Sequence, residues 1–312
     1  MNVTILGSGA FGLALGHLFV SSHNHVTIWS KFQHEVDELR DKYLEVLFTT
    51  NIESAIERAD IVIIAVPIAF VYDTILSLQD LYRNQSIIIA SKGIDSSRLK
   101  FGFQILEELL PDASYGILSG GTFAKDMMND KIMGITLATT DKSIETVVKC
   151  CLENSSFLKI QISHDVIGTS VCGAVKNIMA IGFGMLDGYQ EPPSSKFLFL
   201  TEAILEIQKL IIYFGGDKDT ILSYAGIDDI MMTCTSSESR NYTLGVMIGK
   251  NTDLKEIQDY KSTTTIEGLD TTQAICSLLD HNKNLFPLIS TIYEILYHNL
   301  PVTSFIQVLK NV

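Results

Sequence analysis

The stretch NVTILGSGAFGLALG, residues 2–16, decides the fold of this chain. Its first part, Asn2–Leu6, is rich in β-branched and apolar residues and predicts a strand. Three glycines follow at once in G-x-G-x-x-G spacing, where a helical pattern begins. This spacing between a strand and a helix is typical of a turn that holds a dinucleotide pyrophosphate, although a purely structural turn can look the same. We expect cofactor contacts at Gly7, Gly9, Ala10, Phe11 and Gly12.

The first half of the chain alternates short β-rich runs with helical patterns. Further strands are expected at 25–29, 60–66, 86–91, 114–120, 134–140 and 156–163, and helices at 10–22, 53–59, 70–82 and 100–110. Continuous β-branched runs indicate strands that are buried on both faces. The alternation therefore predicts an α/β domain, a Rossmann-like doubly wound sheet covered by helices.

The pattern changes after about residue 163, where strand-like runs end. Helical patterns follow at 164–186, 195–214, 227–234, 245–250, 267–281 and 287–297. We therefore expect a dinucleotide-binding domain at 1–163 and an all-α domain at 164–312.

Composition and charge limit the classes of function. The 312 residues carry a net charge of −13, which argues against binding to nucleic acids or anionic membranes. Five cysteines without C-x-x-C spacing indicate reduced thiols and no metal site. No apolar run reaches the roughly 18 to 20 residues of a membrane helix, and the apolar start lacks a basic signal-peptide region. We expect a soluble cytoplasmic protein.

The end of the second predicted strand bears on cofactor preference. NAD-selective sites usually carry an acidic residue there, whereas this strand ends in Ser30 and Lys31. A small polar residue and a cation can accept a 2′-phosphate, so the sequence slightly favours NADPH over NADH. Lys31 can equally be a solvated surface lysine.

Several polar residues stand where a ligand cleft is expected. Lys92 follows the fourth strand, and the small residues at 119–124 form a turn whose backbone N–H groups can hold an anion. Lys176 and Asn177 interrupt an apolar helix, where a lysine either extends to solvent or serves proton transfer. Asp229 can pair with Lys176, and Arg240 suits a phosphate.

Together these residues resemble the bacterial type of NAD(P)-dependent glycerol-3-phosphate dehydrogenase. The similarity runs nearly end to end through GSGAFGLAL, KGI, SGGTFAKD, GAVKNIMAIGFGMLDG, AGIDDIMMTCTSSESRN and IEG. It implies that Lys176 is the catalytic acid/base and that Asp229 holds it. It implies substrate contacts at Lys92, Gly120, Thr122, Lys176, Asp229, Ser239, Arg240 and Asn241. It implies cofactor contacts at Lys92, Ala124, Arg240, Thr265 and Glu267, beside the possible contact of Lys31.

The resemblance also implies a reaction and its setting. NAD(P)H passes a hydride to dihydroxyacetone phosphate, which yields sn-glycerol 3-phosphate for phospholipid synthesis, in a homodimer joined through the α domain. The chain departs from the family pattern at Gly121, Asp228, Glu202 and Thr265, and in a shortened loop before Ile52. Two alternatives stay open. One is a related two-domain dehydrogenase with another substrate, and the other is a non-catalytic dinucleotide sensor on the same fold.

Overall fold

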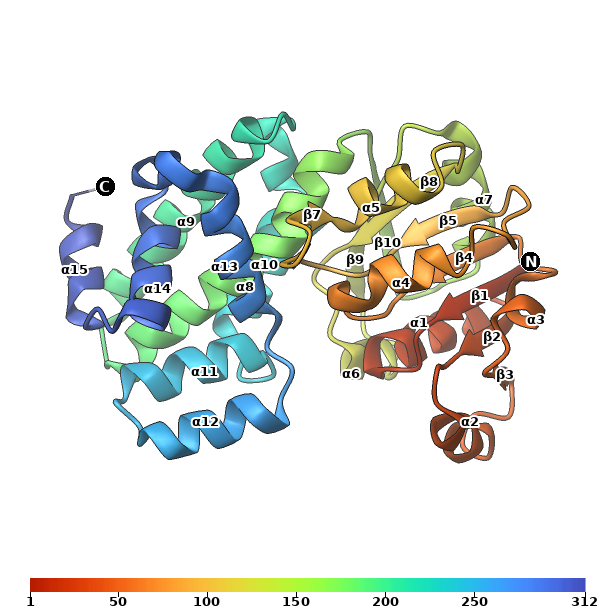
Figure 1. Cartoon of the computed structure of the whole chain (residues 1–312), viewed down its shortest axis with the longest axis horizontal. Helices are drawn as coiled ribbons and strands as arrows, with labels where there is room; N and C mark the ends of the chain where they lie inside the picture. The colour runs from red at the N-terminus through yellow and green to blue at the C-terminus, as the bar shows by residue number, and fades with distance from the viewer. Residues whose placement is uncertain (312) are drawn as a thin grey trace. The chain divides into compact units, whose positions relative to one another are not determined.

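The computed structural model describes residues 1–311 and divides into two compact units (Figure 1). Unit 1 comprises Met1–Lys92 and Phe101–Val166, and unit 2 comprises Gly93–Lys100 and Ile167–Val312. These units differ from the proposed domains 1–163 and 164–312 in the segment 93–100 and in the position of the junction. The functions assigned to the two domains remain proposals.

Unit 1 is built on one sheet, in which eight strands are found among the described residues. They run in the order β10-β9-β8-β5-β4-β1-β2-β3. Their bounds are β1 Asn2–Leu6, β2 His25–Trp29, β3 Val46–Thr49, β4 Ile61–Ile64, β5 Ser86–Ile89, β8 Tyr115–Ser119, β9 Met133–Ala138 and β10 Leu158–Ser163. The order from β3 through β1 to β5 and β8 is that of a Rossmann-like sheet, which confirms the predicted fold class. The β8–β9 pair is antiparallel, so the expected parallel sheet is not parallel throughout.

Helices cover both faces of this sheet, which explains its apolar strands. All four residues of β4 are buried. The helices are α1 Ala10–Ser21, α2 Gln33–Arg40, α3 Ile52–Ile56, η1 Ile68–Phe70, α4 Val71–Leu76, α5 Gly102–Leu109, α6 Ala124–Met127 and α7 Lys142–Leu152. β1 lies between β2 and β4, with Ile5 aligned to Ile28 and to Ile63, so the Gly-rich turn leaves from the middle of the sheet.

Unit 2 is helical except for a short segment at its start. That segment holds β6, Ile94–Asp95, which pairs with β7, Lys100–Phe101, and packs against α13. The helices are α8 Val166–Gly188, α9 Pro193–Tyr213, η2 Lys218–Leu222, η3 Tyr224–Asp228, α10 Asp229–Thr235, α11 Arg240–Gly249, α12 Leu254–Thr263, α13 Glu267–Leu279, η4 Asp280–Leu285, α14 Pro287–His298 and α15 Thr303–Leu309. Figure 1 shows α11 and α12 side by side.

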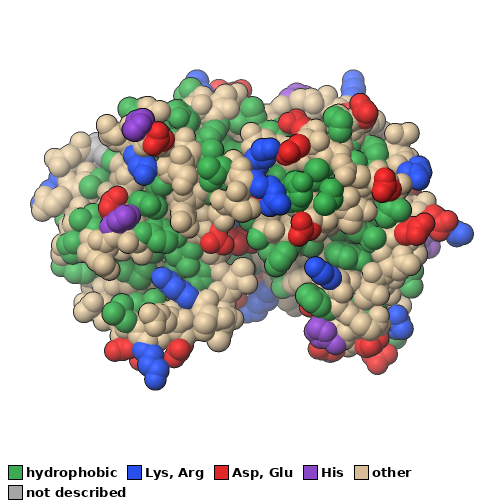
Figure 2. Space-filling model, in the orientation of Figure 1, with side chains coloured by type: hydrophobic (Ala, Val, Ile, Leu, Met, Phe, Trp, Pro, Cys, Tyr) green, Lys and Arg blue, Asp and Glu red, His purple; other side chains and the backbone are tan. Residues whose placement is uncertain are grey.

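The central helix of unit 2 is α8. By length and composition it could cross a membrane, which the sequence analysis did not foresee, but 89% of its most apolar window is buried inside the protein. It is therefore a core helix, and it carries the buried Lys176. On the face shown in Figure 2, acidic and basic side chains are interspersed among hydrophobic ones, so both signs of charge occur there despite the net charge of −13.

Two features of unit 2 depend on close or buried contacts. A Cβ added to Gly184 of α8 would lie 2.2 Å from the carbonyl oxygen of Tyr242, and one added to Gly245 of α11 would lie 2.1 Å from that of Ile181. The backbones of α8 and α11 therefore touch, which fixes the start of α11 beside α8. The second feature is the buried carboxylate of Glu206 on α9.

Glu206 caps the N-terminus of α14 across the helical bundle. Its carboxylate oxygens accept hydrogen bonds from the backbone N–H groups of Leu288 and Ile289 at 2.9 and 2.8 Å. These N–H groups lack intrahelical partners because they belong to the first turn. Burial raises the pKa of Glu206 to about 7, although the two N–H groups favour its charged form.

Candidate active site

The Gly-rich turn joins β1 to α1 in a conformation that needs glycine. Gly7 has a φ of +126°, and a Cβ there would lie 2.8 Å from the carbonyl oxygen of Ala65. Its N–H donates to the carbonyl oxygen of Trp29 at 3.0 Å, which ties the turn to the end of β2. The turn thus lies at the carboxyl ends of adjacent parallel strands, where α/β sheets bind ligands.

The start of α1 fits the pyrophosphate of a dinucleotide. Gly9 is the N-cap of α1, no side chain caps it, and a Cβ at Gly9 would meet no heavy atom within 4 Å. A Cβ at Gly12 would lie 2.0 Å from the carbonyl oxygen of Gly7, so the helix packs directly on the turn. Uncapped N–H groups at the positive end of a helix favour an anion, and the open space beside Gly9 leaves room for one. Ala10 begins the helix and Phe11 follows it.

A carboxylate stands beside this turn where the sequence showed none. Glu35, in the first turn of α2, accepts hydrogen bonds through Oε2 from the hydroxyls of Ser8 and Ser30, the latter at 2.5 Å. No acidic residue belongs to the end of the second strand itself, as the sequence analysis stated. A carboxylate nevertheless lies beside that end, because α2 places Glu35 there. Glu35 and Ser8 were missed by sequence reasoning. The one available signal was an acid five residues after Ser30.

The other predicted residues of unit 1 lie at neighbouring strand ends. Lys92 follows β5, donates a hydrogen bond to the carbonyl oxygen of Gly120 at 3.1 Å, and has its ammonium 5.9 Å from the ring centre of Phe11. Thr122 donates to the same carbonyl oxygen at 3.3 Å. The structure therefore brings Lys92, Gly120 and Thr122 together with the Gly-rich turn. Ala124 begins α6, and Lys31 is exposed after β2.

Unit 2 holds a buried ion pair on α8 and α10. The ammonium of Lys176 donates to Oδ1 of Asp229 at 2.5 Å and to the hydroxyl oxygen of Thr233 at 3.2 Å. Lys176 is 8% exposed and Asp229 is fully buried. The Thr233 hydroxyl in turn lies 2.6 Å from the backbone oxygen of Asp229. A buried charge pair with fixed partners is a candidate for proton transfer. The sequence analysis gave Thr233 no role.

An amide network continues from this pair to the start of α13. The side chain of Asn241 donates to Asn177 at 3.0 Å and accepts from the backbone N–H of Gly268 at 2.9 Å. Asn177 donates to Glu267 at 3.2 Å. Asn241 and Glu267 were predicted as site residues, and Asn177 is the link between them. The network fixes the start of α11 relative to Lys176, because Lys176 and Asn177 are neighbours on α8.

The start of α11 presents a cation at the surface. Ser239 is the N-cap, and its hydroxyl oxygen accepts the N–H of Tyr242 at 3.2 Å. Arg240 is exposed in the first turn, while Asn241 behind it is buried. Thr265 and Asp228 are also exposed, whereas Asp229, which pairs with Lys176, is buried.

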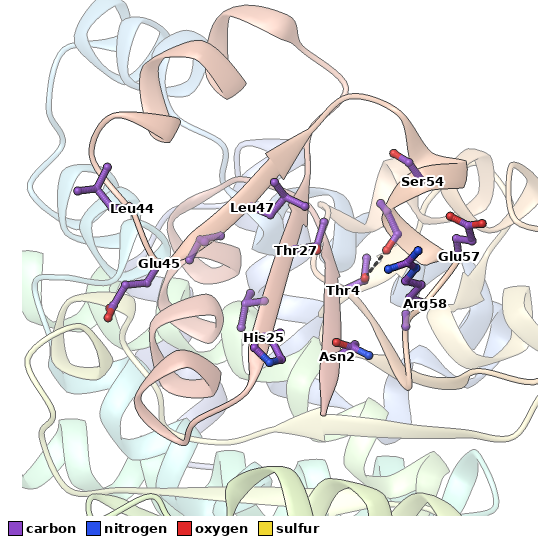
Figure 3. A pocket seen from close by; sticks show the side chains of 14 residues that line it. Asn2, Thr4, His25, Thr27, Leu44, Glu45, Leu47, Ser54, Glu57 and Arg58 are labelled. Atoms are coloured by element: carbon purple, nitrogen blue, oxygen red, sulfur yellow. Dashed lines mark hydrogen bonds between the residues drawn. The ribbon is translucent and has the colours of Figure 1, made fainter.

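A separate depression lies on unit 1, over the amino-terminal parts of β1, β2 and β3 and beside α3 (Figure 3). Asn2, His25, Glu45 and Arg58 are among the residues that line it. Its lining includes none of the predicted site residues. The strands point their carboxyl ends, and with them the Gly-rich turn, away from it.

Comparisons with known proteins agree with these features. Residues 2–145 match the family model for the NAD-dependent glycerol-3-phosphate dehydrogenase N-terminus, and residues 165–307 match the model for its C-terminus. Glycerol-3-phosphate dehydrogenase [NAD(P)+] from Nitrosomonas europaea is 31% identical, over 98% of this chain and 96% of that protein. The enzyme of that name from Macrococcus caseolyticus is also 31% identical, over 100% and 98%.

A solved structure shows the same fold. Glycerol-3-phosphate dehydrogenase from Coxiella burnetii superposes with a TM-score of 0.89 at 24% identity, over 99% of this chain and 98% of that one. The solved structure shows only the fold, whereas the family models and the full-length relatives assign the chain to a family. The chain belongs to the NAD-dependent glycerol-3-phosphate dehydrogenase family.

Proposed function

We propose that this protein interconverts sn-glycerol 3-phosphate and dihydroxyacetone phosphate, with NAD(H) or NADP(H) as the hydride carrier. The names of the full-length relatives support the substrate and the cofactor. The observation in this chain that carries the proposal is the buried pair of Lys176 and Asp229, because ketone reduction needs a positioned proton donor and Asp229 holds this ammonium in place.

Lys176 acts as the general acid in reduction and as the general base in oxidation. Its positive charge stabilises the negative charge that develops on the substrate oxygen during hydride transfer. Its ammonium then donates a proton to that oxygen. Asp229 and Thr233 hold the ammonium in one position. When bound, the nicotinamide supplies or accepts the hydride, and the Gly-rich turn, the start of α1 and Glu267 are the groups proposed to hold the cofactor.

The phosphate of the substrate is assigned to the start of α11. Arg240 offers a planar fork of N–H donors on an exposed first turn, and Asn241 stands behind it with Ser239 as the N-cap. Local cations of this kind let a protein with a net charge of −13 take a dianion. Substrate contacts of Lys92, Gly120 and Thr122, and cofactor contacts of Ala124, Arg240 and Thr265, remain predictions.

The decisive experiment follows absorbance of the reduced nicotinamide with purified protein and dihydroxyacetone phosphate. Oxidation that depends on this substrate, and that a panel of 2-keto acids does not replace, is the expected result. Oxidation with a keto acid alone would favour a related dehydrogenase with another substrate. Cofactor binding without oxidation of either NADH or NADPH would favour the dinucleotide sensor.

We also propose that the protein is a cytoplasmic homodimer that supplies glycerol 3-phosphate for phospholipid synthesis. The dimer is supported by α9, whose outward face carries exposed apolar side chains at seven-residue spacing: Leu198, Leu205 and Ile212. Phe197 extends this face. Sedimentation velocity tests it, since Leu205→Lys is expected to convert a dimer into a monomer. A wild-type monomer would contradict the proposed dimer.

A further inference from the structure

The cluster of Ser8, Ser30 and Glu35 has no role in the function proposed so far. Its members come from three elements of unit 1: the Gly-rich turn, the end of β2 and the first turn of α2. We propose that Glu35 sets the cofactor preference of this chain and favours NAD(H) over NADP(H). This inference rests on the dinucleotide role proposed above for unit 1.

Glu35 lies where the adenosine ribose of a dinucleotide is expected. In dinucleotide-binding α/β folds an acidic side chain at the end of the second strand contacts the adenosine ribose, beside the Gly-rich turn. Here the residue at the end of the strand is Ser30, and the acidic side chain, Glu35, belongs to the following helix, α2. Ser8 belongs to the Gly-rich turn and Ser30 to the end of β2. Because both hydroxyls donate to the same carboxylate oxygen, Glu35 lies beside the turn and beside the strand end.

The chemistry of a carboxylate distinguishes the two cofactors at the 2′ position. An ionised carboxylate only accepts hydrogen bonds, so it suits the 2′-hydroxyl of NAD(H), which can donate one. The 2′-phosphate of NADP(H) has no such donor when ionised and brings about two further negative charges. Both serine hydroxyls already direct their protons to Glu35. A phosphate could use them only if those bonds were broken.

The cluster of Ser8, Ser30 and Glu35 is held rigidly by its hydrogen bonds. Ser30 is 2% exposed, and its oxygen also accepts the N–H of Phe32 at 3.2 Å, so its hydroxyl has little freedom to turn away. Glu35 stands in the first turn of α2, where the helix dipole stabilises a negative charge. The carboxylate is therefore a fixed part of unit 1 and not a mobile surface group.

Lys31 favours the opposite preference. It follows Ser30 directly and is exposed. A flexible exposed lysine loses side-chain entropy when it is ordered, and exposed ion pairs contribute little. A carboxylate held by two hydroxyls has no such cost, so we expect its repulsion of a 2′-phosphate to outweigh the attraction by Lys31.

The test measures binding of NADH and of NADPH to the full-length protein by nicotinamide fluorescence, without substrate. We expect NADH to bind about tenfold or more tightly than NADPH, as a like charge held at short range in a partly buried site implies. In Glu35→Gln the ratio should fall at least about fivefold, mainly through tighter NADPH binding. Glu38→Gln is the matched control, because Glu38 lies on the same helix, is exposed and pairs with Lys42. It should leave the ratio unchanged.

The outcomes separate this inference from the proposed reaction. Tighter binding of NADPH by the wild type, or equal changes for both cofactors in Glu35→Gln, would overturn the role of Glu35. If Glu35→Gln does not fold, Ser30→Ala removes one holding bond and should lower the same ratio; an unchanged ratio there would also count against it. NADH preference that persists without oxidation by dihydroxyacetone phosphate would reject the reaction and leave the cofactor preference supported.

Discussion

The two units handle charge in opposite ways. In unit 1 the Gly-rich turn offers backbone N–H groups to an open surface, and its carboxylate, Glu35, is only half-buried. In unit 2 Lys176 and Asp229 form an ion pair with almost no exposure. The difference teaches that an anion can be bound by backbone dipoles without a buried charge, whereas a proton donor is placed where few waters compete with it.

The largest effect is expected at the buried lysine. Lys176→Ala should lower kcat by a factor of about 10² to 10⁴, the usual contribution of a general acid. Because the Gly-rich turn is left intact, NADH should still bind. Steady-state turnover with dihydroxyacetone phosphate and a separate NADH titration measure the two quantities.

Lys196→Ala serves as a control for the loss of an ion pair in unit 2. Lys196 of α9 pairs with Asp187, and both side chains are partly exposed. We expect this variant to keep most of its turnover. A nearly normal kcat in Lys176→Ala would mean that the buried pair does not supply the proton. The comparison of a buried catalytic pair with an open binding surface would then be wrong.

The buried carboxyl group of Glu206 should make the free energy of unfolding depend on pH. Because folding raises the pKa of Glu206 from 4.5 to about 7, the folded state binds this proton more tightly than the unfolded chain does. Its contribution to stability is complete below about pH 4.5 and is lost as the pH rises through about 7. Relative to Glu206→Gln, the free energy of unfolding of the wild type should fall by up to about 3 kcal/mol between pH 4.5 and pH 8.

Urea unfolding at several pH values measures this difference. Glu256→Gln, at an exposed position on α12, is the control and should track the wild type at every pH. Parallel curves for wild type and Glu206→Gln would show that Glu206 stays charged in the folded protein, held by the two N–H groups of α14.

Arg240→Ala tests whether an exposed cation of unit 2 binds an anion, the phosphate of the substrate, as the exposed Gly-rich turn of unit 1 is proposed to do. Loss of charge-assisted hydrogen bonds should raise KM for dihydroxyacetone phosphate about tenfold or more, with a smaller change in kcat. Initial rates over a range of substrate concentrations separate the two constants. Lys250→Ala, at the far end of α11, is the control. An unchanged KM would remove Arg240 from the phosphate site.

The smallest effect is expected at the Gly-rich turn itself. Ser8→Ala removes one of the two hydroxyls that hold Glu35, and a single hydrogen bond contributes about 1 kcal/mol. The Kd for NADH should therefore rise only about fivefold. Ser54→Ala, within α3, supplies a control hydroxyl outside the Gly-rich turn. A loss of NADH binding in Ser8→Ala would mean that the turn depends on its side chains more than its backbone suggests.

Much of the fold could be predicted because its signals are local. β1 and β2 were placed at their observed bounds, and α8, α9, α13 and α14 at nearly theirs, since long apolar patterns define them. Other elements lacked such a signal. Only Val36 of α2 is buried, and β3 is an edge strand whose Leu47 is exposed. Neither presents the continuous apolar pattern on which the prediction relied.

The candidate site was predictable where a motif carries it and not where chain folding creates it. Lys176 and Asp229 came from the resemblance, and the structure joins them across 53 residues at hydrogen-bond distance. Glu35 could not be found in this way, because its position follows from the turn between β2 and α2. The antiparallel pairing of β9 with β8 likewise depends on tertiary connections that periodicity does not report.

The contact between α8 and α11 has a consequence for how this sequence can change. At Gly184 and Gly245 even a methyl group would collide with a backbone carbonyl, so these positions are closed to every other residue unless the helices separate. Separation would move the N-cap Ser239 and Arg240 away from α8. Random mutagenesis with selection for turnover should therefore leave two invariant glycines far from any reacting group, while the exposed control positions Lys250 and Glu256 vary freely.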